Sequence, residues 1–305
     1  MGRTTTLAAP ALAAALAVTG VQAGHGSPRA HDMPPFITAA CADAARPEAD
    51  TKRDADRHPA LSLAFAGVKP GDQVVELVPG SGYFTRLLSG VVGPKGKVYA
   101  APPARRPQAA ADSPDPAAPV QAIAADPHYG NVTVSVQRFT QLALPQGVDL
   151  VWTSQNYHDF HNVPDLQVVD LDRAVFKALK PGGVYLVLDH AAEAGSGFRD
   201  TSTLHRIDPE AVKKEVISAG FKLEARSALL GNTGDPHTAK VFDPAMRGHT
   251  DQFILKFRKP EVRSLRVRGS SSPAKYLRSA SRNRGPSLAS PAAHANNVMH
   301  ERNFR

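Results

Sequence analysis

The fold is decided by residues 73–90, which read QVVELVPGSGYFTRLLSG. An apolar run rich in β-branched residues ends at Glu76, and a turn built on Gly80 and Gly82 follows it. Apolar side chains then recur at helical spacing up to Val91. A buried strand that leads through a glycine turn into a helix lets a ligand approach the backbone and points free N–H groups at negative charge. Because Glu76 stands where it can accept hydrogen bonds from a ribose or an amine, the stretch favours a nucleoside-type ligand over a bare phosphate.

The sequence before residue 190 alternates between strand and helix patterns. Strand patterns cover residues 73–77, 97–101, 131–137, 148–154 and 184–189. Helix patterns cover residues 55–66, 83–91 and 164–179, and the Pro/Ala/Asp-rich residues 102–125 predict a loop. Strands that alternate with helices pair in parallel through helical crossovers.

The end of the domain breaks this alternation. Asp208 is expected to cap a helix that stops at Gly220. Strands over residues 221–227 and 250–257 follow without a helix between them that is long enough for a crossover, so we expect them to pair antiparallel. The sequence therefore predicts an α/β fold with a doubly wound, mainly parallel seven-stranded sheet and a C-terminal antiparallel strand pair.

The two ends of the chain differ from this central domain. Residues 1–23 combine Arg3, an Ala/Leu/Val run and a small-residue cleavage site at Ala23, a pattern typical of a secretory signal peptide. A polar leader (24–50) precedes the domain at 51–260, and no other apolar run is long enough to cross a membrane. We therefore expect a protein that is exported to the periplasm and has no membrane span.

Positive charge is concentrated in a C-terminal tail. The net charge is +8, and residues 261–305 contain nine Lys/Arg against two acids, which leaves the preceding residues close to neutral. The tail has few bulky apolar residues, so we expect it to be disordered. The basicity does not belong to a binding face of the folded domain, and we expect no specific nucleic-acid partner. The single cysteine excludes a disulfide within the chain.

Several motifs occur in a fixed order between residues 50 and 260. They include ELVPGSGY (76–83), VDLVWTSQNYHD (148–159), LKPGG (179–183) and VFDPAMRG (241–248). This ordered set resembles the class I S-adenosylmethionine-dependent methyltransferases, and more closely an exported bacterial group of predicted methyltransferases with no assigned substrate. The resemblance implies the Rossmann-like methyltransferase fold, S-adenosyl-L-methionine as cofactor, and methyl transfer to a small-molecule acceptor.

The resemblance also implies which residues hold the cofactor. They are Glu76, Pro79, Gly80, Ser81, Gly82, Tyr83 and Asn156. The methionine carboxylate of the cofactor would lie near the amides that follow the glycine turn, where a helix N-terminus attracts negative charge. Glu76 would accept a hydrogen bond from the ammonium group of the cofactor.

Three positions depart from the pattern of this family. Val78 stands where a glycine is usual, from which we expect a wider turn. Ala101 ends the second strand and Gln137 the third, where acids usually hold the ribose and the adenine. A hydrogen-bonded anchor contributes about 1–3 kcal/mol when its partner would otherwise be buried unpaired. The departures predict weak cofactor binding and leave a second interpretation open, a non-catalytic ligand-binding module on a methyltransferase scaffold in the periplasm.

The catalytic candidates lie in QNYHD (155–159), directly after the fourth strand. We expect the ring of Tyr157 to cover the sulfonium and His158 to accept a proton from the acceptor. Asp159 is expected to hold the tautomer of His158. The alternative is that His158 and Asp159 only cap the start of a helix.

We also consider the same segment as a metal site. His158, Asp159 and His161 could bind a metal together with Asp189 or His190, but a His-x-x-His spacing without a fixed helix does not define such a site, and we expect none.

A dinucleotide dehydrogenase would need a third glycine where Thr85 stands, and an acid after the second strand. Both features are missing, so the sequence argues against that class. Trp152 lies inside the fourth strand and is expected to belong to the core.

Overall fold

The computed structural model of the protein describes residues 33–105, 110 and 112–261. The predicted signal peptide (1–23) lies outside the described residues, as does the predicted tail apart from Glu261. Of the predicted polar leader, only the part from Met33 onward is described, and it includes two short helices.

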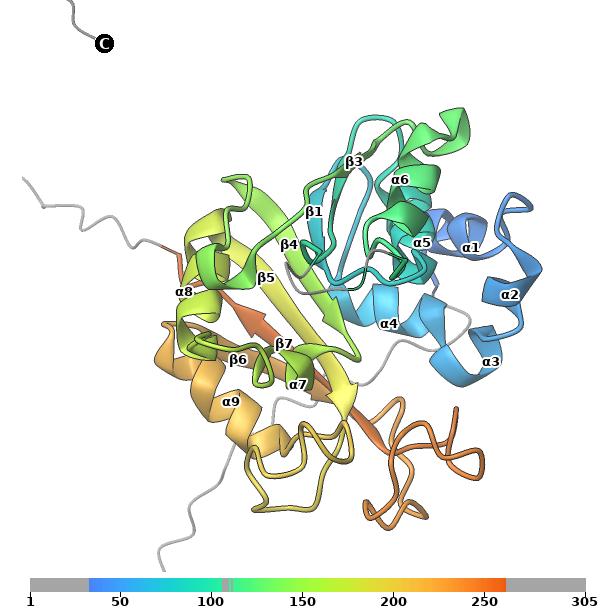
Figure 1. The fold of residues 1–305 in the computed structure, drawn as a ribbon. Coiled ribbons are helices and arrows are strands. Elements are labelled where there is room, and N and C mark those ends of the chain that lie inside the picture. The colour runs from blue at the N-terminus through green and yellow to red at the C-terminus, as the bar shows by residue number, and fades with distance from the viewer. Residues whose placement is uncertain (1–32, 106–109, 111, 262–305) are drawn as a thin grey trace, which may run out of the picture. The chain divides into compact units, whose positions relative to one another are not determined.

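A seven-stranded sheet with the order β3-β2-β1-β4-β5-β7-β6 forms the centre of the fold (Figure 1). Its strands are β1 (Gln73–Leu77), β2 (Lys97–Ala101), β3 (Val132–Val134), β4 (Val148–Ser154), β5 (Leu179–His190), β6 (Lys222–Ser227) and β7 (Gln252–Arg258). Strands β1 to β5 pair in parallel, and β7 runs antiparallel to both β5 and β6. The predicted mainly parallel sheet with a C-terminal antiparallel pair is confirmed, although β3 is shorter and β5 longer than expected.

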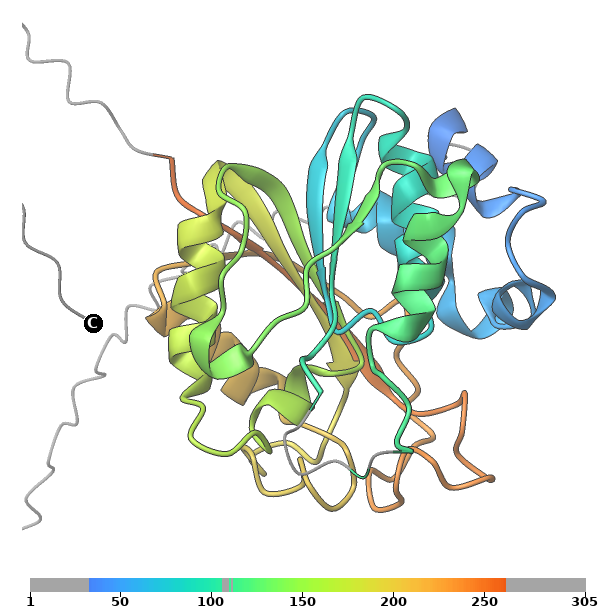
Figure 2. The same ribbon diagram turned by 45° about the horizontal axis from the view of Figure 1, so that its top comes forward.

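Helices cover both faces of the sheet, as Figure 2 shows. They are α1 (Pro35–Cys41), α2 (Glu48–Thr51), α3 (Asp54–Arg57), α4 (Pro59–Ala66), α5 (Tyr83–Val92), α6 (Ala118–Ala125), α7 (Tyr157–Phe160), α8 (Val168–Ala178) and α9 (Pro209–Ser218). One apolar cluster joins the sheet to α1, α4, α5 and α6, and a second joins it to α7, α8 and α9. The sheet is therefore doubly wound, as predicted. Among the described helices, none has both the length and the apolar character that crossing a membrane requires.

Two local predictions need correction. The helix expected over residues 55–66 is broken into α3 and α4 at His58, whose φ is 41°. Pro59 follows directly, and a residue before proline is disfavoured in the α conformation. The expected loop over residues 102–125 contains α6, which buries Val120 and Ile123 at helical spacing.

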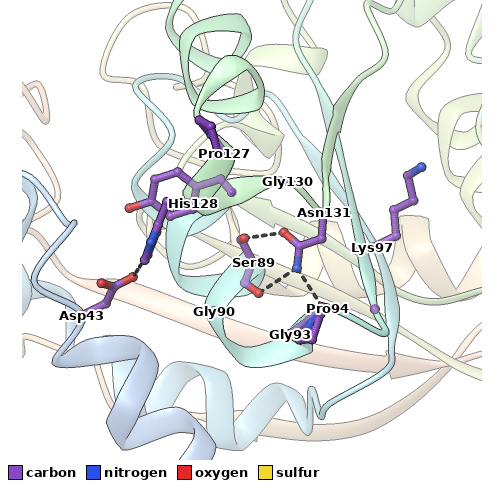
Figure 3. A pocket seen from close by; sticks show the side chains of 12 residues that line it. Asp43, Ser89, Gly90, Gly93, Pro94, Lys97, Pro127, His128, Gly130 and Asn131 are labelled. Carbon is purple, nitrogen blue, oxygen red and sulfur yellow. Dashed lines mark hydrogen bonds and ion pairs between the residues drawn. The ribbon is translucent and has the colours of Figure 1, made fainter.

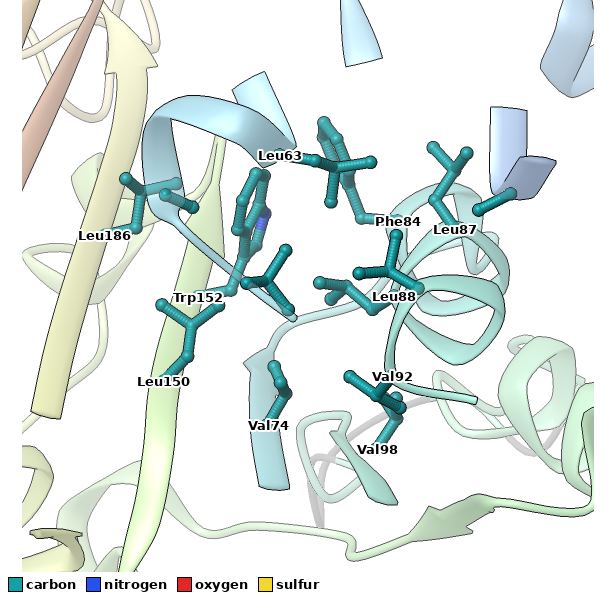
Figure 4. Packing of buried hydrophobic residues seen from close by; sticks show 14 of the residues in the cluster. Leu63, Val74, Phe84, Leu87, Leu88, Val92, Val98, Leu150, Trp152 and Leu186 are labelled. Atoms are coloured by element: carbon teal, nitrogen blue, oxygen red, sulfur yellow. The ribbon is translucent and has the colours of Figure 1, made fainter. Parts of the chain in front are cut away.

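The core on the α5 face is built around Trp152 (Figure 4). Trp152 is fully buried, which confirms its predicted place in the core. Its ring centroid lies 4.6 Å from that of Phe84, which belongs to the first turn of α5. The lone tryptophan is thus in direct contact with the helix that follows the glycine turn.

The parallel strands β1, β2, β4 and β5 all end at one edge of the sheet, which we call the carboxyl edge. The opposite edge, where these strands begin, is the amino edge. In Figure 1 the loops over residues 191–208 (yellow) and 228–251 (orange) lie beyond the arrowhead of β5, at the carboxyl edge. The fold therefore brings the glycine turn, α7 and these two loops to the same edge.

Candidate functional site

A pocket of about 240 Å³ lies at the carboxyl edge, where β1 and β4 are neighbours in the sheet. The chain continues from β1 to β2 on one side and from β4 to β5 on the other, so this is the point where the strand order reverses. Open α/β sheets bind their ligands at such a point. The pocket is lined by Arg53, Arg57, Glu76, Leu77, Val78, Pro79, Gly80, Ser81, Tyr83, Phe84, Ser154, Gln155, Asn156 and Asp159.

The glycine turn has a left-handed backbone at three positions. The φ angles are 50° at Val78, 58° at Gly80 and 83° at Gly82. Val78 adopts the conformation that a glycine would take, which costs a β-branched residue about 1–3 kcal/mol. Valine in place of glycine at position 78 is thus accommodated by backbone strain. The structure gives no support to the wider turn that we expected there.

The two glycines of the turn are required for different reasons. A Cβ built on Gly80 would meet no atom within 4 Å, so only its φ angle favours glycine there. A Cβ on Gly82 would lie 2.1 Å from Cδ1 of Ile123 in α6. Gly82 therefore lets α6 pack closely on the start of α5, and it is not among the residues that line the pocket.

Glu76 stands at the floor of the pocket with 3% of its surface exposed. Its Oε2 accepts a hydrogen bond of 2.5 Å from the Thr85 hydroxyl. Burial raises the pKa of Glu76 to about 8, against the smaller opposing effect of the Thr85 hydrogen bond. The carboxyl group therefore holds its proton at neutral pH until a cation comes to lie beside it.

Tyr83 ties the glycine turn to the helices that precede β1. Its hydroxyl donates a hydrogen bond of 2.6 Å to Oδ1 of Asp54, which also pairs with Arg46 at 2.7 Å. The guanidinium of Arg57 lies 4.7 Å from the centroid of the Tyr83 ring. The segment of residues 46–57 thereby covers one side of the pocket.

This segment brings two cations to the pocket that the sequence analysis missed, Arg53 and Arg57. Burial lowers the pKa of Arg57 to about 10, and the charge of Arg53 adds to this effect. Arg57 remains charged at neutral pH, and it donates a hydrogen bond to the side chain of Gln155. In the sequence the two arginines look like ordinary helix-surface residues, because their approach to the glycine turn depends on packing between distant segments.

Asn156 joins the end of β4 to the glycine turn. Its Nδ2 donates to the carbonyl oxygens of Val78 at 3.1 Å and Ser154 at 2.8 Å, and its Oδ1 accepts from the Thr153 hydroxyl. These bonds engage both ends of the amide. Asn156 lines the pocket as predicted, and its geometry is that of a positioning residue.

Tyr157 does not lie at the pocket, which corrects its expected place over a sulfonium. The side chain is fully buried in the core between β5, α8 and α9. Its hydroxyl lies 2.9 Å from a carboxylate oxygen of Asp172 and 2.9 Å from one of Glu215. Residue 157 begins α7, and the start of this helix turns its first side chain inward.

His158 is held by a carboxylate, but the residue is Asp189 and not Asp159. His158 Nδ1 lies 2.9 Å from Asp189 Oδ1, and the His158 backbone N–H donates to Asp189 Oδ2 at 2.8 Å. Burial lowers the pKa of His158, but the charges of Asp189 and Asp159 outweigh it and raise the pKa above its ordinary value. Nε2 of the same ring points toward Asp159, at 3.3 Å from Oδ1.

The other two candidate metal-ligating histidines have different partners, although the ring centroid of His190 lies 6.3 Å from that of His158. His161 stacks on Phe198 with ring centroids 4.1 Å apart, and its Nε2 lies 3.1 Å from Glu215. His190 Nδ1 lies 2.8 Å from the Thr250 hydroxyl, and burial lowers the pKa of His190 to about 4.

Instead, His205 from the loop before α9 joins His158 and Asp159. One ligand-type atom of each lies within 4.8 Å of the other two. No sequence signal could have paired His205 with Asp159, because the two are 46 positions apart along the chain and meet only through the fold.

The ends of β2 and β3 offer no acid to an adenosine. Ala101 is fully buried and its carbonyl accepts from the Val78 N–H at 3.1 Å. The Gln137 side chain donates to Ser135 Oγ at 2.7 Å and accepts from the Ala143 N–H at 3.0 Å. Gln137 is thus engaged within its own loop.

A second hollow, of about 610 Å³, lies at the amino edge (Figure 3). Its polar side chains are bonded to one another: Ser89 and Asn131 share a hydrogen bond, and Asn131 Nδ2 donates to the Gly93 carbonyl at 2.9 Å. His128 pairs with Asp43 at 2.7 Å. This hollow is larger than the carboxyl-edge pocket, and these four side chains are already paired, whereas the buried Tyr129 hydroxyl has no hydrogen-bond partner among the described residues.

Comparisons with known proteins support the fold. No protein-family model matches the chain. The structure is similar to the [4+2]-cyclase SpnF, with 17% sequence identity, 72% of this chain and 85% of that chain covered, and a TM-score of 0.52. It is also similar to a SAM-dependent methyltransferase from Aquifex aeolicus, with 18% identity, 65% and 87% covered, and a TM-score of 0.45. A third is an S-adenosylmethionine-dependent methyltransferase from Mesorhizobium loti, with 19% identity, 67% and 97% covered, and a TM-score of 0.46.

The chain has the Rossmann-like methyltransferase fold. The similarity to SpnF, at a TM-score of 0.52 and 17% identity, shows a shared fold alone and leaves the activity to the residues of the site, because one fold hosts many activities.

Proposed function

We propose that the protein binds S-adenosyl-L-methionine at the carboxyl-edge pocket and transfers its methyl group to a small-molecule acceptor. The observation that carries the proposal is the charge pattern of the pocket. Glu76 lies at the floor, Arg57 lies at the wall, and the N-terminus of α5 follows the glycine turn. An amino acid group carries one positive and one negative charge, and this arrangement matches both.

The ammonium group of the cofactor would lie beside Glu76 and favour the ionised form of its carboxyl. The carboxylate would lie between Arg57 and the amides that begin α5. Pockets for drug-sized ligands enclose about 300–1000 Å³. A pocket of 240 Å³ suits the methionine part of the cofactor, and the adenosine would extend toward the ends of β2 and β3.

Methyl transfer needs an aligned acceptor and little covalent help, because the sulfonium is already a reactive electrophile. The methyl carbon bonds to the acceptor oxygen or nitrogen, and the sulfur keeps the electron pair of the broken bond. His158 does not itself line the pocket, so the acceptor proton would pass by way of Asp159 to Nε2 of His158, whose Nδ1 is held by Asp189. Asp159 lines the pocket and lies beside His158, so it would orient the acceptor. Tyr157 has no place in this proposal.

The second candidate is a ligand-binding module without catalysis. It is favoured by Ala101 and Gln137, neither of which offers a carboxylate to the ribose or the adenine. It also agrees with export, since the methyl donor is not expected in quantity in the periplasm. The proposal includes that location, and the mass of the mature protein tests it: cleavage after Ala23 would leave Gly24 as the first residue.

Fluorescence of Trp152, the single tryptophan of the chain, tests cofactor binding directly. Phe84 touches Trp152 and also lines the pocket, so a ligand there should change the emission. We expect a saturable change with S-adenosylmethionine. Gly80→Ala should weaken binding tenfold or more, because the turn cannot keep its left-handed backbone without about 1–2 kcal/mol of strain.

The matched control is Gly93→Ala. Gly93 also has a positive φ, 63°, and open space around a Cβ, but it lies at the amino edge. This variant should bind the cofactor as the parent does. A flat titration that calorimetry confirms would exclude the enzyme. Binding without transfer to any nucleophile in an acceptor screen would favour the binding module.

A further inference from the structure

Two imidazoles and one carboxylate converge beside the carboxyl-edge pocket. His158 and Asp159 belong to α7, and His205 belongs to the loop between β5 and α9. Asp159 Oδ1 lies 3.3 Å from His158 Nε2 and 3.7 Å from His205 Nδ1. A tetrahedral ion with bonds of about 2.0–2.1 Å keeps its ligand atoms about 3.3–3.4 Å apart. The two spacings to Asp159 Oδ1 are therefore within about 0.4 Å of those around such an ion, and one ligand-type atom of each of the three residues lies within 4.8 Å of the other two.

The orientation of His158 leaves a lone pair for a cation. Its Nδ1 faces Asp189 at 2.9 Å, so the proton of the neutral ring belongs on Nδ1. Nε2 then presents a lone pair to Asp159, which carries lone pairs of its own. Two such acceptors 3.3 Å apart repel each other unless a cation, a proton or a metal ion, lies between them.

Asp189 gives His158 the support that metal-binding histidines usually have. The Asp189 side chain is fully buried, and it also accepts the backbone N–H groups of His158 and His190, each at 2.8 Å. A buried carboxylate behind a ligating imidazole fixes the ring and raises its basicity. The Asp189–His158 pair is thus oriented before any ion arrives.

His205 is held in place by a strained but anchored loop. Its φ is 57°, a left-handed conformation that costs a non-glycine residue about 1–3 kcal/mol. The next residue, Arg206, is fully buried, pairs with Asp235 at 2.7 Å and donates to the Ala191 carbonyl at 3.0 Å. The ring of His205 also packs edge-on against Phe242, with centroids 4.9 Å apart. Backbone strain that the surrounding structure maintains in this way clusters at ligand sites.

We propose that His158 Nε2, Asp159 Oδ1 and His205 Nδ1 bind a divalent transition-metal ion of the Zn²⁺ class. Two nitrogen donors and one carboxylate suit Zn²⁺, Co²⁺ or Fe²⁺, whereas Mg²⁺ and Ca²⁺ prefer oxygen donors alone. The Asp159 side chain is 51% exposed and lines the carboxyl-edge pocket. Three protein ligands leave a fourth position open for water or for an oxygen, nitrogen or sulfur atom of a small molecule in that pocket.

The metal site goes beyond the proposed function and does not depend on it, because the ion would bind whether or not a methyl donor does. If both hold, His158 is a ligand and not a base. The acceptor would then belong to the small molecules that coordinate a metal, and the ion would lower the pKa of the atom that receives the methyl group.

Calorimetric titration of the metal-stripped, untagged full chain with Zn²⁺ alone tests the site, with no S-adenosylmethionine present. We expect one tight ion per chain. His205→Ala and Asp159→Asn should each weaken binding at least tenfold. Both side chains are partly exposed, so these variants are expected to fold, and thermal unfolding in the presence of a chelator checks this. His128→Ala, at the exposed amino-edge pair with Asp43, is the matched control and should bind as the parent does.

Co²⁺ provides a second readout, since its visible absorption reports a low-symmetry nitrogen and oxygen site. That absorption should appear in the parent and in His128→Ala and disappear in His205→Ala. The proposal is overturned if neither ion binds, or if His205→Ala and Asp159→Asn both bind Zn²⁺ with the parent affinity. A failed cofactor titration leaves these results unaffected, so the two proposals can fail separately.

Discussion

The two hollows of the molecule lie at opposite ends of the same helix. Helix α5 begins after Gly82 beside the 240 Å³ pocket and ends at Gly93 beside the 610 Å³ hollow. Both ends use a glycine with positive φ. The helix dipole makes its N-terminus attractive to anions and its C-terminus attractive to cations. The same local structure therefore offers opposite charges to a ligand at the two edges of the sheet.

The two hollows differ mainly in the pairing and the pKa values of the side chains that line them. At the amino edge, Asn131 bonds to Ser89 and to the Gly93 carbonyl, and His128 pairs with Asp43. No carboxyl or guanidinium group among the described residues of this lining has a strongly shifted pKa. At the carboxyl edge, burial raises the pKa of Glu76 to about 8 and lowers that of Arg57 to about 10. Perturbed groups in a concave site are a better indicator of function than volume.

Backbone strain shows the same contrast. Two non-glycine residues that line the carboxyl-edge pocket have left-handed φ angles, 50° at Val78 and 59° at Gln155, and His205 beside the pocket has a φ of 57°. The residues that line the amino-edge hollow include a positive φ only at Gly93, where it costs nothing. Because backbone strain clusters at functional sites, it points to the smaller pocket as the functional one.

The largest expected effect concerns Glu76 and the pH dependence of stability. Below its ordinary pKa of 4.5 the carboxyl is protonated in both the folded and the unfolded chain. Between pH 4.5 and about 8 the unfolded chain releases the proton while the folded chain keeps it, so the free energy of unfolding falls as pH rises. The loss amounts to about 5 kcal/mol at most.

Glu76→Gln should remove this loss, because an amide still accepts the Thr85 hydrogen bond and never ionises. Urea unfolding at pH 5 and pH 9 measures the free energy of unfolding of both proteins. The variant should be more stable than the parent at pH 9 and about as stable as the parent at pH 5. It should also bind S-adenosylmethionine more weakly, since the ammonium loses its charged partner. Asp43→Asn, at the amino edge, is the control and should show no such gain. Equal pH slopes for the parent and Glu76→Gln would refute the buried, protonated state of Glu76.

What could be predicted from the sequence depends on how local its cause is. The strand, turn and helix of residues 73–92 follow from local periodicity, and the antiparallel end of the sheet follows from a missing crossover. Helix α6 was missed because only Val120 and Ile123 mark its buried face, in a stretch rich in proline. Local patterns of this kind determine the framework.

The site itself depends on contacts that no local pattern reveals. Arg57 reaches the pocket because α3 packs on Tyr83, and His205 reaches Asp159 because a buried ion pair anchors its loop. Tyr157 was misplaced for a related reason: the sequence identified the segment after β4, but not the direction in which each side chain of α7 points. Candidate site residues can thus be found from the sequence, but the residues from distant segments that contact them cannot.

A smaller effect separates the two glycines at the ends of α5. Gly82→Ala introduces a Cβ 2.1 Å from Ile123 Cδ1 and forces a residue with φ of 83° to carry a side chain. The clash costs about 1–3 kcal/mol, and the left-handed backbone about 1–2 kcal/mol more. Gly93→Ala meets no clash, because a Cβ there has no neighbour within 4 Å, but its φ of 63° and ψ of −169° lie in a region that is essentially restricted to glycine and costs another residue about 1–3 kcal/mol. We therefore expect Gly82→Ala to destabilise the protein by about 2–5 kcal/mol and Gly93→Ala by about 1–3 kcal/mol.

Urea unfolding of both variants measures these values, and a second substitution separates the two costs at Gly82. Ile123→Val removes the Cδ1 atom that the new Cβ would meet, so it should recover part of the loss in the Gly82→Ala background while destabilising the parent slightly. If Ile123→Val costs the same in both backgrounds, the close approach of α6 is not what requires glycine at position 82. The two ends of α5 would then differ only in the charge that they offer to a ligand.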